Sequence, residues 1–211
     1  MINATNESKK RELIPAGNYI ARCYSMVHVG TVKEEVLGEM KVQNKCRITW
    51  ELPTELRVFD EAKGEQPLVI SKEYTLSMHE KSNLRKDLES WRGKQFTEEQ
   101  AKSFDITKLL GVACMLNIIH KVTKSGSDYA TISNISSIPK GFVCPEQVNK
   151  NYEWNFEDAW DEIALNAMPD FIKDKIKSSA EYKAIKSEII DVTHDEPATD
   201  NEPENNNDLP F

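Results

Sequence analysis

Apolar and polar residues alternate with a period of two along the first third of the chain, which is the pattern of a strand with one buried face. The alternation predicts strands at residues 19–29, 41–52 and 68–78, the last of them rich in Val, Ile, Thr and Tyr. A stretch with two glycines, residues 31–39, and a charged stretch, residues 60–65, separate these segments. Both are predicted to be loops or hairpin tips.

The second of these strands has the clearest two-faced pattern. Its apolar residues, among them Ile48, Trp50 and Leu52, point to one side, and its Lys, Arg, Gln and Thr residues point to the other. Pro53 is expected to end the strand, because proline has no N–H group to donate to a neighbouring strand.

The period then changes to that of a helix. Leu84, Leu88 and Trp91 lie on one apolar stripe, and Gly93 is expected to end this amphipathic helix. Thr97, followed three residues later by a glutamine, predicts a capping box that opens a second, short helix.

Two more alternating segments, residues 112–123 and 129–138, flank a Ser-Gly-Ser turn and predict a hairpin. Five strands with a helix between the third and the fourth is the order of an OB-fold, a small Greek-key barrel. The predicted class is therefore mainly β with added helices: a five-stranded OB-fold barrel with a helical insertion between strands 3 and 4 and a C-terminal helical region. A different sandwich with a helical insertion is the main alternative.

Composition divides the chain into four parts. Residues 1–13 are predicted to be a flexible arm and residues 14–149 the OB-fold domain. Residues 150–190 are predicted to be a helical extension, and residues 191–211 a disordered acidic tail.

The predicted extension carries short apolar faces, one of them formed by Phe171, Ile172 and Ile176. Such a face needs a partner surface. The extension is therefore expected either to pack on the barrel or to form contacts between copies in a homo-oligomer.

The net charge of −8 argues against a nucleic-acid-binding protein only until it is divided along the chain. Residues 1–149 hold 21 basic and 19 acidic residues, residues 150–190 hold 6 and 9, and residues 191–211 hold none and 7. The acidity lies in the last third of the sequence. A surface that binds phosphates is therefore compatible with the low pI.

A barrel that binds single strands needs cations for the phosphates and rings for the bases on one face. Lys41, Lys45 and Arg47 are evenly spaced in the second predicted strand, so they point to the same side. A cation and a ring recur together in the first strand, in the third strand and in the last hairpin. The candidate residues for binding single-stranded DNA are Arg22, Tyr24, Lys41, Lys45, Arg47, Lys72, Tyr74, Lys121, Lys124 and Tyr129.

Each of these candidates has a structural alternative. Outward Lys and Arg residues also keep a barrel soluble and protect its edges. Tyr74 shares its parity with apolar neighbours and Trp50 lies among apolar residues, so both rings could belong to the core. Arg85, Lys86 and Arg92 in the first helix are either solvated or a second patch that contacts the nucleic-acid backbone.

The last four residues end an acidic stretch that has no Lys or Arg. A polar segment with three apolar residues at its tip has nothing to bury against itself, so it makes sense as a hook for a basic-rimmed apolar pocket on another protein. The predicted partner-binding residues are Asp208, Leu209, Pro210 and Phe211. They resemble the C-terminal tip of bacterial-type single-stranded DNA-binding proteins; a generic disordered tail is the alternative.

Catalysis, metals and cofactors find no support in the sequence. It has no P-loop, G-x-G-x-x-G, H-E-x-x-H or G-x-S-x-G motif, so an enzyme is not expected. Its four cysteines are scattered and form no C-x-x-C pair, which argues against a zinc site. With no signal peptide and no apolar run of membrane-spanning length, a cytoplasmic location without a membrane partner is expected.

Five segments resemble a group of phage and prophage proteins that are treated as OB-fold single-stranded DNA-binding proteins. These segments are residues 14–23 (IPAGNYIARC), 48–53 (ITWELP), 71–94, 109–118 and 138–141 (IPKG). The resemblance implies non-catalytic coating of single strands during phage replication or recombination, in the cytoplasm of a bacterial host.

The resulting hypothesis is a protein that binds single-stranded DNA with little sequence preference and recruits replication or repair proteins through its tip. An adaptor or inhibitor that uses the tip without binding DNA is the alternative from another class. A single-strand annealing protein is a third possibility, and the sequence does not distinguish DNA from RNA.

Overall fold

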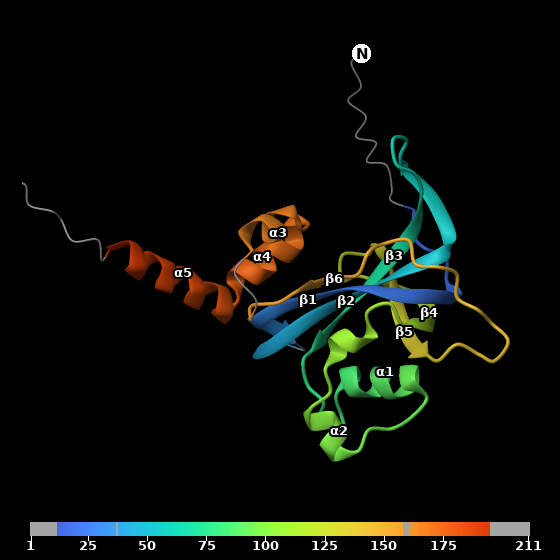
Figure 1. The fold of residues 1–211 in the computed structure, drawn as a ribbon, viewed down its shortest axis with the longest axis horizontal. Helices are drawn as coiled ribbons and strands as arrows, with labels where there is room; N and C mark the ends of the chain where they lie inside the picture. Colours follow the sequence, from blue (N-terminus) through green and yellow to red (C-terminus); the bar gives the residue numbers. More distant parts are fainter. Residues whose placement is uncertain (1–11, 37, 158–160, 195–211) are drawn as a thin grey trace, which may run out of the picture.

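Five antiparallel strands form the centre of the molecule in the computed structural model, which describes residues 12–36, 38–157 and 161–194. The strands lie in the order β3-β2-β1-β4-β5 and curl into a half-barrel (Figure 1). Helices follow β3 and the last strand, so the predicted class is confirmed: mainly β, with a helical insertion and C-terminal helices. The strand bounds are β1 Gly17–Val36, β2 Glu39–Asp60, β3 Gly64–Thr75, β4 Ala113–Val122 and β5 Asp128–Ser136.

The first two strands are longer than predicted. Residues 31–36 continue β1 and pair with β2 as far as Val36 opposite Glu39, so the expected loop is reduced to a tight hairpin. Pro53 does not end β2, and that prediction is wrong. The pairing with β3 is irregular between Leu52 and Leu56, and proline is tolerated at such a bulge because no regular ladder hydrogen bond is lost there.

A first core fills the concave side of the half-barrel under the helical insertion. The insertion consists of α1 Asn83–Arg92, α2 Glu98–Lys102 and the 3-10 turn η1 Ile106–Leu109. Leu84, Leu88 and Trp91 of α1 are buried, as the stripe predicted, and the Trp91 ring lies 5.9 Å from that of Trp50. Gly93 ends α1 in the left-handed conformation, and the capping box at Thr97 is present.

A second, smaller core attaches the C-terminal part to β1. A short strand, β6 Tyr152–Trp154, pairs in parallel with β1, and α3 Glu162–Ala167, α4 Asp170–Ser178 and α5 Ala180–His194 follow. The helices lie at the end of the sheet opposite the β2–β3 hairpin (Figure 1). Buried residues of both parts meet there: Val27, Val29, Val32, Trp154, Leu165, Met168 and Ile176.

Gly30 shows how closely the extension packs. Its φ of 89° lies in the left-handed region, and a Cβ built there would lie 2.7–2.9 Å from Glu181, Ser179 and Phe156. Of the two possibilities left open for the extension, packing on the barrel is therefore observed. Helix α5 runs to His194, four residues beyond the expected end of the extension.

Among the described residues, no helix has the length and apolar character needed to cross a membrane.

Candidate functional site

On β2 and β3, the outer face of the sheet has a strip of partly exposed residues between two coverings. Outward positions pair across β2 and β3 as Arg47 opposite Glu73, Thr49 opposite Ser71, and Glu51 opposite Val69. Helix α4 contacts the Arg47–Glu73 end, and the segment of residues 142–151 contacts the Glu51 end. We call the surface formed by Tyr24, Arg47, Thr49, Ser71 and Glu73 the outer strip.

Two polar residues hold the 142–151 segment in place: Arg22, which is a predicted site residue, and Glu51, which is not. Glu51 is fully buried and accepts hydrogen bonds from the backbone N–H groups of Val148 (2.9 Å) and Asn149 (2.8 Å). Arg22 donates to the carbonyl oxygens of Gly111 (2.7 Å) and Pro145 (2.8 Å). The Arg22 guanidinium is therefore engaged in fixing loops, which argues against its predicted role as a contact to DNA.

Lys45 lies in a neutral network of two cations and two carboxylates. It pairs with Glu34 and, at 3.3 Å, with Glu73, while Lys175 of α4 lies 2.5 Å from a carboxylate oxygen of each. Burial acts to raise the pKa of Glu34, but the two lysines outweigh it and hold that pKa below its ordinary value. Lys45 is thus no free cation, contrary to the prediction for its row on β2.

Arg47 is different, because it is partly buried and forms no ion pair among the described residues. No carboxylate of the described residues lies within 4.0 Å of its guanidinium, which instead lies over the Phe171 ring, with Cζ 5.1 Å from the ring centroid. Burial lowers the pKa of Arg47, and the charge of Glu73 offsets part of that effect. Burial also raises the pKa of the neighbouring Tyr24; Glu51 adds to the rise and Arg47 opposes it.

The predicted pair on β3 belongs to the interior. Tyr74 is only 4% exposed and donates a hydrogen bond of 2.7 Å to Asp87 of α1. Lys72 forms an ion pair of 2.6 Å with the same carboxylate. Tyr74 therefore presents no ring to a base, a correction to its predicted role, and Trp50 is likewise buried in the core.

The remaining predicted residues are exposed but lie elsewhere. Lys41 is near the β1–β2 hairpin tip and pairs with Glu39 at 3.3 Å. Lys121 and Tyr129 face each other across the β4–β5 hairpin, beyond the start of β1, with Lys124 in the turn. Because Arg47 pairs ten residues further along β1, with Val27, the hairpin is a separate surface.

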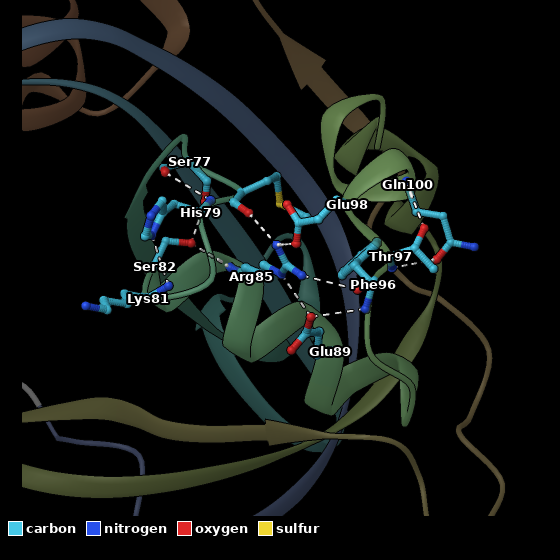
Figure 2. Close-up of polar contacts among 11 residues, drawn as sticks. Ser77, His79, Lys81, Ser82, Arg85, Glu89, Phe96, Thr97, Glu98 and Gln100 are labelled. Carbon is cyan, nitrogen blue, oxygen red and sulfur yellow. Dashed lines mark hydrogen bonds and ion pairs between the residues drawn. The ribbon is translucent and has the colours of Figure 1, made fainter.

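Arg85 of α1, whose role the sequence left open, is structural. Figure 2 shows Arg85 between the start of α1 and the loop before α2. It donates to Glu89 (3.0 Å), to Glu98 (2.9 Å) and to the carbonyl oxygens of Met78 and Phe96. Arg92 lies over the Phe96 ring at 4.0 Å, and Lys86 is exposed. Of the three residues, Arg85 is held by carboxylates, Lys86 is exposed to solvent, and Arg92, like Arg47, lies over a ring and forms no ion pair within the described part of the chain.

The side chains that could bind a metal do not gather in the described ranges, where no group of three or more His, Cys, Asp or Glu residues is found. Comparison with protein-family models, with curated proteins and with solved structures gives no match for this chain. A function for the outer strip therefore has to be inferred from the residues that form it. Asp208, Leu209, Pro210 and Phe211 lie outside the described residues.

The sequence interpretation missed Phe171 as a surface residue. Ile172 and Ile176 pack in the second core as expected, but Phe171 is 60% exposed and points to the outer strip. Phe171 and Lys175 are four residues apart in α4, so they share a face, and both contact residues of β2 or β3. The four-residue spacing of Phe171 and Lys175 was the feature of the sequence that could have indicated a shared surface.

Proposed function

We propose that the protein binds single-stranded DNA along the outer strip, with little sequence preference, and keeps the strand unpaired. Residues 208–211 then bring replication or repair proteins to the coated strand. The proposal accords with the half-barrel, whose outer face is open between α4 and the 142–151 segment.

The observation that carries this proposal is the state of Arg47. Withdrawing a cation from water is unfavourable unless an anion or a hydrogen-bond acceptor compensates it. Other engaged cations of the sheet have such partners: Lys45 has Glu34 and Glu73, and Lys72 has Asp87. Arg47 forms no such ion pair within the described residues: its guanidinium lies over the Phe171 ring, and the charge of Glu73 offsets only part of the effect of burial, which leaves the guanidinium available to a phosphate.

The neighbours of Arg47 suit an unpaired strand. Tyr24 offers a partly exposed ring, and the hydroxyl groups of Thr49 and Ser71 lie 2.9 Å apart on the adjacent strands, where they can bind sugar or phosphate oxygens. Bases of a duplex are stacked on each other and cannot reach such a ring, whereas those of a single strand can. Nothing in this set distinguishes one base from another.

Fluorescence anisotropy of a labelled oligo-dT, against a matched duplex and at two salt concentrations, tests the proposal. We expect binding to the single strand with little binding to the duplex. Arg47→Glu should weaken binding at least about tenfold, because a charge-assisted contact is replaced by repulsion. The slope of log affinity against log salt should fall by at least about 0.7, the share of one phosphate contact.

Lys102→Glu is the matched control, because Lys102 is an exposed cation on α2 at the far side of the insertion. It changes the net charge equally and should leave affinity within about twofold, since it makes no local contact with the strand. Equal loss in both variants, or wild-type protein that ignores oligo-dT, would overturn the assignment.

An adaptor that acts through residues 208–211 without DNA is the second candidate, favoured by the neutral network around Lys45. Deletion of Phe211 separates the two. If the protein coats DNA and recruits partners, the deletion leaves oligo-dT affinity unchanged or higher and abolishes co-purification of replication proteins assembled on the coated strand. Retention of those proteins after the deletion would refute the hook.

A further inference from the structure

Helix α4 places an aromatic ring on a surface that is otherwise made of strands. Phe171, at the start of α4, is 60% exposed, although the next residue and Ile176 are directed into the second core. Its ring lies against Arg47 of β2, 5.1 Å from Cζ to the ring centroid. One turn later, Lys175 contacts Glu73 of β3 at 2.5 Å. The helix therefore borders the outer strip with a ring, followed by a lysine that pairs with Glu34 and Glu73.

The ring is mounted on a firmly attached element. Ile176 is fully buried among residues of β1, and Glu181 at the start of α5 accepts two hydrogen bonds of 2.6 Å from Thr31, one from its N–H group and one from its hydroxyl. At Gly30, Ser179 and Glu181 approach the backbone of β1 so closely that a side chain at this position would not fit. A ligand that meets Phe171 meets a ring already in position, which lowers the entropic cost of binding.

From this geometry we infer that Phe171 is a base-stacking residue and that α4 and the sheet together form one composite site for single-stranded DNA. This inference rests on the proposed function and adds a second element to its site. A base stacks on the Phe171 ring, while the adjacent Arg47 guanidinium contacts the phosphate of the same or the next nucleotide. Tyr24, a second neighbour of Arg47, is placed to receive a neighbouring base.

The competing explanation is that Phe171 only packs against Arg47. A single exposed aromatic ring is common on protein surfaces, and a cation over a ring stabilises a fold by itself. The two explanations differ in what the ligand must contain. Stacking requires a base, whereas a purely structural role makes the effect of removing the ring independent of bases.

The test measures binding of Phe171→Ala to oligo-dT and to an abasic sugar-phosphate strand of the same length and charge. We expect a loss of roughly 5- to 100-fold on oligo-dT, the fold-change that corresponds to one stacked base. On the abasic strand the loss should be under about twofold. Phe59→Ala is the matched control, since Phe59 is 59% exposed and lies near the far end of β2. It should leave both affinities unchanged.

A second variant keeps the test independent of folding. Phe171→Trp retains a ring, so it should keep the affinity for oligo-dT and gain tryptophan fluorescence that is quenched when oligo-dT, but not the abasic strand, is added. Equal losses on both strands, or no loss with no quenching, would overturn the inference while leaving the proposed function in place. Wild-type protein that fails to bind oligo-dT would overturn the proposed function itself.

Discussion

Two arginines on two sides of the half-barrel show how differently one residue type can be used. Arg85 of the helical insertion is 5% exposed and is held by Glu89, Glu98 and two backbone carbonyl oxygens (Figure 2). Arg47 of the outer strip is partly buried, yet it forms no ion pair within the described residues; its guanidinium lies over the Phe171 ring, with Glu73 on the opposite strand. The first arginine organises the fold, and the second is available to an anion.

The position of a cation on a sheet or helix says little about phosphate binding until its partners are known. Lys45 and Arg47 lie on the same face of β2, two residues apart, as their spacing predicted. Lys45 is neutralised by carboxylates from β1 and β3, whereas Arg47 forms no ion pair within the described residues. A surface that binds phosphates therefore depends on the cations that the fold leaves without a carboxylate.

The largest expected effect comes from removing Arg85. Arg85→Ala removes the guanidinium from Glu89 and Glu98 and frees the carbonyl oxygens of Met78 and Phe96, so the loop before α2 keeps only part of its attachment to α1, including the hydrogen bond from the Phe96 N–H group to Glu89. We expect the melting temperature, measured by circular dichroism, to fall further than in Arg47→Ala. The protein that remains folded should bind oligo-dT with unchanged affinity.

Arg47→Ala should give the reverse result: a melting temperature close to that of the wild type and weaker binding of oligo-dT. If the two variants lost stability equally, the contrast between the two arginines would be false.

A smaller effect is expected from pH, through the carboxylates that hold the extension. Burial acts to raise the pKa of Glu181, but the hydrogen bonds from Thr31 outweigh it, so the pKa lies below its ordinary value, as it does for Glu34. A lowered carboxylate pKa stabilises the folded state above the unfolded pKa of about 4.3, and that stabilisation is lost as pH falls through the folded pKa. The attachment of α4 and α5 should thus be unchanged from pH 7 to pH 5.

Below about pH 4 the extension should become accessible before the barrel unfolds, which limited digestion with pepsin can detect. Glu181→Gln should remove part of this pH dependence. Release of the extension near pH 6, where these carboxylates remain charged, would contradict the account.

Periodicity predicted most of the fold because each strand and helix records its buried face in its own sequence. The stripe of Leu84, Leu88 and Trp91, and the alternation around Trp50, are of this kind. The continuation of β2 past Pro53 was missed because a bulge depends on the partner strand, which local sequence does not contain.

The candidate site was harder to predict for a related reason. Even spacing places Lys41, Lys45 and Arg47 on one face, but it carries no information about carboxylates from distant segments such as Glu34 and Glu73. Parity did indicate that Tyr74 could be a core residue, and the structure places it there. Phe171 was grouped with Ile172 and Ile176 on one apolar face of its helix. In so short a helix, adjacent apolar residues do not show which of them is buried.

The most direct test of the central claim is amide hydrogen exchange of the full chain with and without oligo-dT. We predict slower exchange in the β2 and β3 segments around Arg47 and Ser71 and in the first turn of α4, with no change in α1 and α2. Protection confined to the insertion around Arg85, or to the β4–β5 hairpin, with none along the outer strip, would contradict it.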